Sequence, residues 1–178
     1  MKVDLEKKSY AERRRIKSTL KFVQDSMPAE SKLLDLGTPN DMGAYLRQHG
    51  FQVDHAHGVD FDEEPEIIAK EGYDAVTMFE VLEHLINPMG ILKAVKAPKL
   101  IASVPLDNWF STAYRNKNDR WDQHFHEFED WQFEWLLEKS GWKIIRSEKW
   151  TSPIGKIGFR PLLRRYTPRY FIVEAERP

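Results

Sequence analysis

Apolar residues recur along the chain in two patterns, one typical of helices and the other of buried strands. Within residues 4–24, Ile16, Leu20 and Val23 are spaced as on one helix face, and Pro28 ends that element. Short apolar runs predict strands at 32–36, 51–59, 73–79 and 100–104. Helical patterns occur at 41–48, 66–70, 87–95 and 129–139, and two closing strands are expected at 142–146 and 170–176.

This alternation predicts an α/β protein with a Rossmann-like, doubly wound sheet that is mostly parallel and covered by helices on both faces. The pattern predicts no helix between the last two strands, so we expect them to form an antiparallel pair at one edge. The length of 178 residues fits a single domain with one sizeable core. We expect the helix within residues 1–31 to pack on this core.

Composition excludes several classes of protein. No apolar run approaches the roughly 20 residues that a membrane span needs, so we expect no membrane association. The N-terminus has no apolar segment of the kind found in a secretory signal. Cysteine is absent, which excludes disulfides and cysteine-ligated zinc. We therefore expect a cytoplasmic protein.

Charge does not favour a nucleic-acid partner. The formal net charge is -1, although basic residues cluster in two places, which we interpret as solvated faces: Arg13 to Arg15, and Arg160, Arg164, Arg165 and Arg169. The sequence indicates no oligomeric state.

Polar residues follow three of the predicted strands. Asp35 and Gly37 close the first strand, aspartates at positions 54, 60 and 62 surround the end of the second, and Glu80, Glu83 and His84 follow the strand at 73–79. In doubly wound sheets, ligands bind at the carboxyl ends of the strands. These residues are therefore the candidates for function.

Three segments resemble the class I S-adenosylmethionine-dependent methyltransferases, roughly from Lys32 to the C-terminus. LLDLG is similar to the family's first strand and glycine-rich turn, and YDAVTMFEVLEHLINP resembles its strand-and-loop signature with E-x-L-E-H. The segment HFHEFEDWQFEWLLEKSGWKIIRSEKW resembles the later part of many small-molecule members. The resemblance implies that residues 32–178 form a methyltransferase-like domain with S-adenosylmethionine as its cofactor.

The resemblance also implies cofactor-binding roles for Asp35, Gly37, Asp60, Phe79 and Glu80. Glycine lets the backbone approach the methionyl portion closely. A carboxylate after the second strand can accept hydrogen bonds from both ribose hydroxyls. We prefer Asp60 to Asp54 for this role, because Gly58-Val59-Asp60 resembles the family's G-V-D.

The chain departs from the family in two respects. The turn reads DLGTPND where the family has D-x-G-x-G-x-G, so Pro39 and Asp41 replace the second and third glycines. Proline adds bulk, and Asp41 adds negative charge near the expected cofactor carboxylate. Only about a dozen residues separate Asp60 from Tyr73, too few for the family's usual helix and strand, so we expect a sheet one strand short.

Histidines are the candidate catalytic groups, since a base is needed when the acceptor is a hydroxyl or a protonated amine. The candidates are His84, His124 and His126, with many aromatic residues near the last two. In an alternative reading, Glu80, Glu83 and His84 lie on one helix face and bind a metal together with a later histidine. This set resembles the metal site of the methyltransferases that modify small-RNA ends. We expect no divalent metal.

Three hypotheses follow. The first is a methyltransferase that acts on oxygen or nitrogen of a small molecule. The second, suggested by Pro39, Asp41 and the missing strand, is a methyltransferase-like binding protein without catalysis. The third is a metal-dependent RNA ribose methyltransferase that uses the Glu-Glu-His set and the arginines near 160–169.

Overall fold

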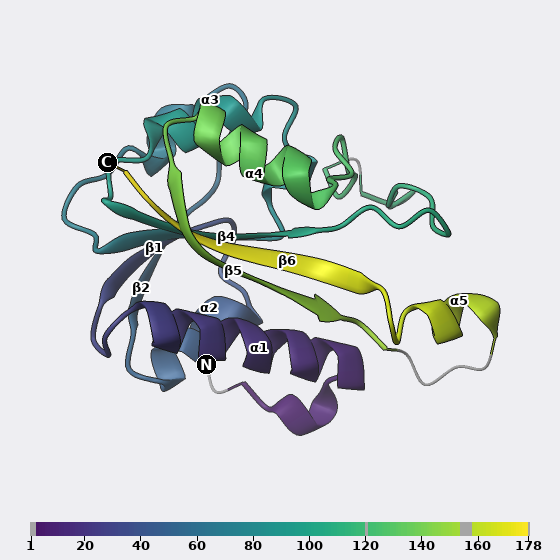
Figure 1. The fold of residues 1–178 in the computed structure, drawn as a ribbon. Coiled ribbons are helices and arrows are strands. Elements are labelled where there is room, and N and C mark those ends of the chain that lie inside the picture. The colour runs from purple at the N-terminus through teal and green to yellow at the C-terminus, as the bar shows by residue number, and fades with distance from the viewer. Residues whose placement is uncertain (1–2, 120, 154–157, 178) are drawn as a thin grey trace.

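The structure is a computed structural model that describes residues 3–119, 121–153 and 158–177. Within these residues, one sheet has the strand order β2-β1-β3-β4-β6-β5 (Figure 1). The strands are β1 (Lys32–Leu36), β2 (Gln52–Ala56), β3 (Ala75–Phe79), β4 (Lys99–Pro105), β5 (Lys143–Thr151) and β6 (Pro168–Glu176). β1 to β4 pair in parallel, whereas β6 is antiparallel to both β4 and β5. The predicted sheet, with its antiparallel C-terminal pair, is confirmed.

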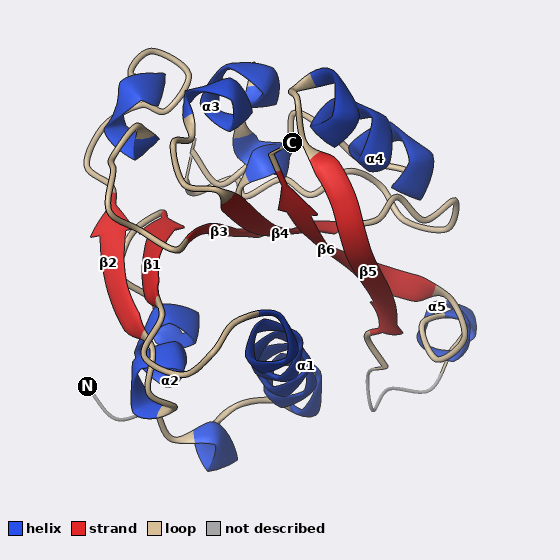
Figure 2. Cartoon of the chain, turned by 60° about the vertical axis from the view of Figure 1, so that its left-hand side comes forward, coloured by secondary structure: helices blue, strands red, loops and turns tan. Residues whose placement is uncertain are grey.

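Helices cover both faces of the sheet, as a doubly wound fold requires (Figure 2). One face carries α1 (Tyr10–Ser26) and α2 (Asp41–Gln48), and the other carries α3 (Pro88–Ala94) and α4 (Asp130–Lys139). A fifth helix and three 3-10 turns complete the described elements: α5 (Phe159–Leu163), η1 (Leu5–Lys7), η2 (Pro65–Ile68) and η3 (Leu82–His84).

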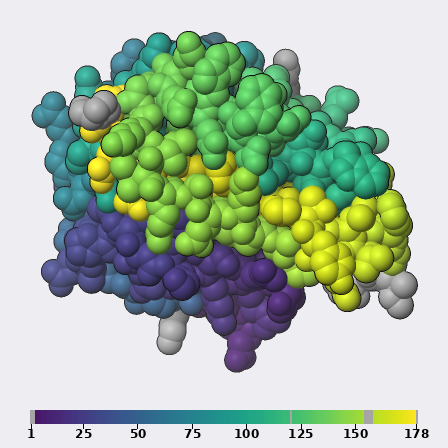
Figure 3. All heavy atoms as spheres, viewed as in Figure 1, coloured from purple at the N-terminus to yellow at the C-terminus, as the bar shows by residue number. Residues whose placement is uncertain are grey.

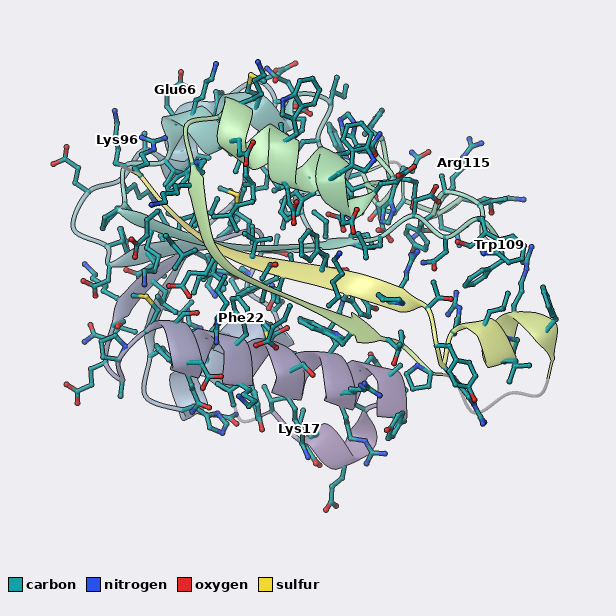
Figure 4. The ribbon with its side chains drawn as sticks, viewed as in Figure 1. Lys17, Phe22, Glu66, Lys96, Trp109 and Arg115 are labelled. Atoms are coloured by element: carbon teal, nitrogen blue, oxygen red, sulfur yellow. The ribbon has the colours of Figure 1, made fainter. Side chains whose placement is uncertain are left out.

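Alternation along the strands divides the apolar core between the two faces. In β1, Leu33 belongs to the cluster under α1 and α2, while Leu34 belongs to the cluster under α3 and α4. Phe22 of α1 is fully buried and points toward the sheet, whereas Lys17 of the same helix points away from it (Figure 4). Successive residues of a central strand therefore face opposite helical layers.

Two predicted boundaries were wrong. The first helix begins at Tyr10 instead of Asp4, because Ser9 and Glu12 form a capping box and residues 5–7 form the separate turn η1. The second strand ends at Ala56 instead of Val59, and Gly58 then adopts a φ of +93° in the following loop. Asp60 consequently lies in a loop, four positions beyond the end of β2.

The prediction of a sheet one strand short is confirmed. Residues 57–74, all of which are described, contain the turn η2 and no strand. Ile68 of η2 is fully buried, in the apolar cluster that also contains Ile91 and Leu92 of α3. This segment therefore packs against α3 instead of adding a strand to the sheet.

The closing hairpin is longer than predicted. β5 continues to Thr151, and α5 lies between β5 and β6, so the expectation that no helix separates them was wrong. In the space-filling view, the yellow residues around α5 lie next to teal residues from the segment after β4 (Figure 3). There, the rings of Phe159 and Trp109 are 6.3 Å apart (Figure 4). None of the described helices is both long enough and apolar enough to cross a bilayer.

Candidate functional site

A cavity of about 840 Å³ opens at the carboxyl ends of β1 and β3. Its walls come from four segments: the turn after β1, the loop after β2, the loop after β3 that contains η3, and the segment between β4 and α4. This is the position at which parallel α/β sheets bind their ligands. We refer to it below as the large cavity.

Gly37 provides an open wall of this cavity. Its φ is +124°, and a Cβ placed there would meet only Val81 Cγ2, at 3.9 Å. Pro39 and Asp41, which were expected to obstruct the cofactor, do not line the large cavity, although Asp41 lines the smaller cavity beneath α1. Asp41 begins α2 and pairs with Lys8. The altered turn therefore leaves room beside Gly37.

The three candidate aspartates after the second strand have different surroundings. Asp54 accepts a hydrogen bond from the Tyr73 hydroxyl, at 2.9 Å, and does not line the large cavity. Asp62 accepts hydrogen bonds from the backbone N–H groups of Ile86 and Asn87, at 2.8 and 2.7 Å, which fastens the loop to the start of α3. Asp60 lines the cavity and accepts one hydrogen bond, from the Asp62 N–H. Asp60 is thus the best placed of the three for a ligand.

Asp35 lies beneath the cavity floor instead of lining it. Its side chain is buried, accepts a hydrogen bond from the Thr77 hydroxyl at 2.5 Å, and has its other oxygen 3.4 Å from Nδ1 of His55. His55 was not singled out in the sequence, yet its ring is buried against Gly43 of α2. The available signal was a histidine that follows Val53 by two positions in β2, where the alternation predicts an apolar residue. The cofactor-binding role expected for Asp35 stays a prediction.

Glu80 lies at the junction of the large cavity and a smaller one of about 330 Å³ beneath α1, which Phe79 also lines. Its φ is +57°, a left-handed conformation that is uncommon outside glycine. The Ser103 hydroxyl donates a hydrogen bond to Glu80, and Arg15 lies 3.9 Å from its second oxygen. Burial raises the pKa of Glu80, whereas Arg15 and the Ser103 hydrogen bond oppose this rise.

The candidate histidines have three different environments. His84 lines the large cavity, and its Nδ1 lies 3.0 Å from the carbonyl oxygen of Gln123. His124 packs edge-on against His84 with ring centroids 4.9 Å apart, and its Nδ1 lies 2.7 Å from Glu127. His126 stacks on Phe128 and contacts the Ile86 carbonyl oxygen at 3.3 Å. Of the three, only His84 lines the large cavity.

Glu83 is buried between the first two histidines. Burial, and then repulsion from Glu80, raise the pKa of Glu83 well above its usual range. Burial and the neighbouring His124 lower the pKa of His84, which favours its neutral form. The single helix face suggested for residues 80, 83 and 84 is wrong, because Glu80 precedes η3 in a left-handed conformation. Glu83 and His84 instead meet His124.

The fold and this cavity define an α/β protein with a large cavity at the carboxyl ends of its parallel strands. A family model described as methyltransferase domain matches residues 8–147. The chain therefore belongs to the methyltransferase domain family, and this membership implies S-adenosylmethionine as the cofactor. A search of curated protein sequences finds no match.

Solved structures share this architecture at low sequence identity. A Burkholderia thailandensis 1,6-didemethyltoxoflavin-N1-methyltransferase, bound to 1,6-didemethyltoxoflavin and S-adenosylhomocysteine, has a TM-score of 0.65 and 16% identity over 98% of this chain and 81% of that chain. A S-adenosylmethionine-dependent methyltransferase from Archaeoglobus fulgidus has a TM-score of 0.60, with 12% identity over 91% of this chain and 94% of the other. The magnesium protoporphyrin IX methyltransferase of Synechocystis PCC 6803, bound to S-adenosylhomocysteine, has a TM-score of 0.59 and 15% identity over 100% and 89%.

The residues around the large cavity fit an adenosyl sulfonium. Gly37 leaves its backbone accessible, and Asp60 offers a carboxylate to hydroxyl donors. Carboxylates are numerous among the lining residues, which suits a cationic sulfur: Asp60, Asp62, Glu63, Glu80, Asp119 and Asp122. The shape and charge of the cavity are therefore compatible with the cofactor that the family implies.

Proposed function

We propose that this protein transfers the methyl group of S-adenosylmethionine to oxygen or nitrogen of a small aromatic acceptor that is neutral or positively charged. The observation that carries the proposal is the large cavity, which combines an open glycine turn, many carboxylates and exposed aromatic rings. Gly37, Asp60 and Glu80 would hold the cofactor, and the far wall would hold the acceptor.

Two exposed aromatic side chains support an aromatic acceptor. Trp121 and Phe125 line the large cavity, although 74% and 58% of their surfaces are exposed. Large exposed rings are costly in water and offer flat surfaces on which a planar molecule can stack. Methyl transfer depends mainly on alignment of acceptor, methyl and sulfur, which stacking of this kind can supply.

The charge of the lining supports a neutral or cationic acceptor. Among the described residues, six carboxylates line the cavity and no lysine or arginine does. A phosphate or carboxylate on the acceptor would meet repulsion there. This argues against a ribose methyltransferase for RNA ends, whose substrate carries phosphates close to the reacting hydroxyl.

Calorimetric titration with S-adenosylhomocysteine tests the cofactor half of the proposal. We expect saturable binding that weakens when Asp60 is replaced by alanine. Asp54→Ala is the matched control, because Asp54 lies in β2, just before the same loop, but does not line the cavity. Absence of binding to the wild-type protein at millimolar ligand would favour a methyltransferase-like module without catalysis.

Transfer of labelled methyl to a panel of phenols, aromatic amines and aromatic carboxylates tests the acceptor half. We expect products from the first two groups and little from the third. Trp121→Ala should raise KM for the acceptor and leave affinity for S-adenosylhomocysteine unchanged. Trp131→Ala is the control, since Trp131 is similarly exposed but lies on α4, outside the cavity. Preference for carboxylates would contradict the proposal.

A further inference from the structure

Three ligand-type side chains converge at one wall of the large cavity. Glu83 and His84 come from η3, and His124 comes from the segment before α4. Glu83 Oε1 lies 3.9 Å from Nε2 of His84 and 4.0 Å from Nε2 of His124. One ligand atom from each of the three residues lies within 4.8 Å of the other two.

The hydrogen bonds of the two imidazoles fix which nitrogen faces Glu83. Nδ1 of His84 lies 3.0 Å from the Gln123 carbonyl oxygen, which can only accept, so this nitrogen carries the hydrogen. Nδ1 of His124 lies 2.7 Å from the Glu127 carboxylate, and the same reasoning applies. In each neutral ring, Nε2 then presents a lone pair. Both lone pairs face Glu83.

With Glu83 ionised and both rings neutral, the three side chains therefore turn only acceptor atoms toward one another. The Glu83 side chain is 1% exposed, and its Oε2 has no hydrogen-bond partner among the described residues. An ionised carboxylate in this position is destabilised, because it is buried and, among the described residues, its own backbone N–H is the only hydrogen-bond donor that offsets the burial. A cation between the three atoms would satisfy all of them.

We propose that Glu83, His84 and His124 bind a divalent transition-metal ion of the zinc type. Two imidazoles and one carboxylate form a common protein ligand set for zinc, whereas magnesium prefers oxygen ligands. The Gln123 carbonyl and the Glu127 carboxylate are the outer partners that orient metal-bound imidazoles. Bonds of about 2.0–2.1 Å to a tetrahedral ion put ligand atoms roughly 3.4 Å apart. The separations from Glu83 exceed this by only about 0.6 Å.

A metal ion bound by these three residues would affect the large cavity, because His84 lines that cavity. The backbone carbonyl of Glu83 already accepts hydrogen bonds from the N–H groups of Phe125 and His126, at 2.8 and 3.1 Å. A bound ion would add a second link between η3 and the segment that carries Trp121 and Phe125. An ion bound by His84 would also lower the pKa of an acceptor hydroxyl that binds beside it. This effect on the acceptor rests on the proposed function, whereas the proposal that the metal binds does not.

Metal analysis of untagged protein, expressed with added zinc and dialysed, tests the inference. We expect one zinc ion per chain, and, after chelation and exchange into Co²⁺, a visible absorption band typical of imidazole ligation. His124→Ala and Glu83→Gln should lose the ion. Glu127→Gln should weaken zinc affinity by about 10–100-fold, as is typical of an outer partner. His126→Ala should keep the ion, because its ring contacts Ile86 and Phe128 instead.

Two results would overturn the inference. One is wild-type protein that holds no zinc and gives no Co²⁺ band. The other is zinc uptake that is equal in the wild type and in folded His124→Ala, which would mean an adventitious ion only. The wild-type Co²⁺ spectrum requires no variant to fold. Titration of the same samples with S-adenosylhomocysteine separates failure of this inference from failure of the proposed function.

Discussion

Two buried clusters of carboxylate and imidazole lie near the carboxyl ends of the central strands, and they differ in their donors. In the first, Asp35 accepts a hydrogen bond from the Thr77 hydroxyl and lies beside His55, closed over by α2. In the second, Glu83 faces the lone pairs of His84 and His124 at the wall of a cavity. The first cluster has its donor within the protein. Among the described residues, both clusters keep buried atoms without a hydrogen-bond partner, the ring nitrogens of His55 in the first and Glu83 Oε2 in the second. They differ in that the second lies at a cavity wall, where a cation could reach it.

The largest expected effect comes from removal of the carboxylate in the closed cluster. Asp35→Ala should lower the free energy of unfolding by about 3–5 kcal/mol, because it leaves the Thr77 hydroxyl and His55 buried without their partner. Urea denaturation measures this. Asp54→Ala, on the exposed side of β2, should cost under about 1 kcal/mol and serves as the control. Equal losses of unfolding free energy in the two variants would contradict a structural role for Asp35.

A second change tests how tightly the closed cluster is packed. A Cβ at Gly43 would come 2.7 Å from Cε1 of His55, so Gly43→Ala should lower the free energy of unfolding by about 1–3 kcal/mol. In a His55→Ala background the same change should cost little, because the clashing ring is gone. A double-mutant cycle followed by urea denaturation measures the coupling. Additive effects would show that His55 is not the obstacle.

The open cluster should respond in the opposite direction. In metal-free protein, at a pH high enough to ionise Glu83, Glu83→Gln supplies an amide N–H₂ donor to the lone pairs of His84 and His124 and should raise the free energy of unfolding by about 1 kcal/mol. Denaturation in the presence of a chelator measures this. With zinc added, the wild type should be more stable than Glu83→Gln, because the variant lacks the carboxylate ligand. A loss of stability in the metal-free variant would contradict the absence of donors around Glu83.

The smallest effect concerns pH and Glu80, which lies between the two clusters. Burial raises the pKa of Glu80 in the folded protein above its usual value of 4.5. A carboxyl of this kind stabilises the fold at low pH, and this contribution is lost as pH rises through the folded-state pKa. The Tm of the wild type should therefore fall relative to the Tm of Glu80→Gln as pH increases above 4.5. A pH-independent difference would contradict the raised pKa.

Sequence patterns predicted the sheet, and exactly located the strand at 32–36 and the helix at 41–48. They were less accurate where local signals compete. The capping box of Ser9 and Glu12 marks the true start of α1, yet apolar spacing alone extended that helix to Asp4. β5 was predicted too short because this edge strand, KIIRSEKWT, is rich in charged residues.

Which residues line the candidate site depends on the direction of each side chain. A strand pattern predicts only the face of the sheet on which a side chain lies. Asp35 and Gly37 are two residues apart, but Asp35 turns beneath α2 while Gly37 lines the cavity. Likewise, only long-range packing brings His124 to Glu83 and directs His126 toward Ile86. Contacts between segments about 40 residues apart have no signature in a single sequence. Cofactor-binding roles for Gly37, Asp60 and Glu80 remain predictions.

A crystal structure of the protein with S-adenosylhomocysteine tests the central claim most directly. The account predicts adenosine in the large cavity, with its ribose hydroxyls within hydrogen-bond distance of Asp60 and the sulfur between Gly37 and His84. Ligand bound elsewhere, or a large cavity that stays empty at saturating ligand, would contradict it.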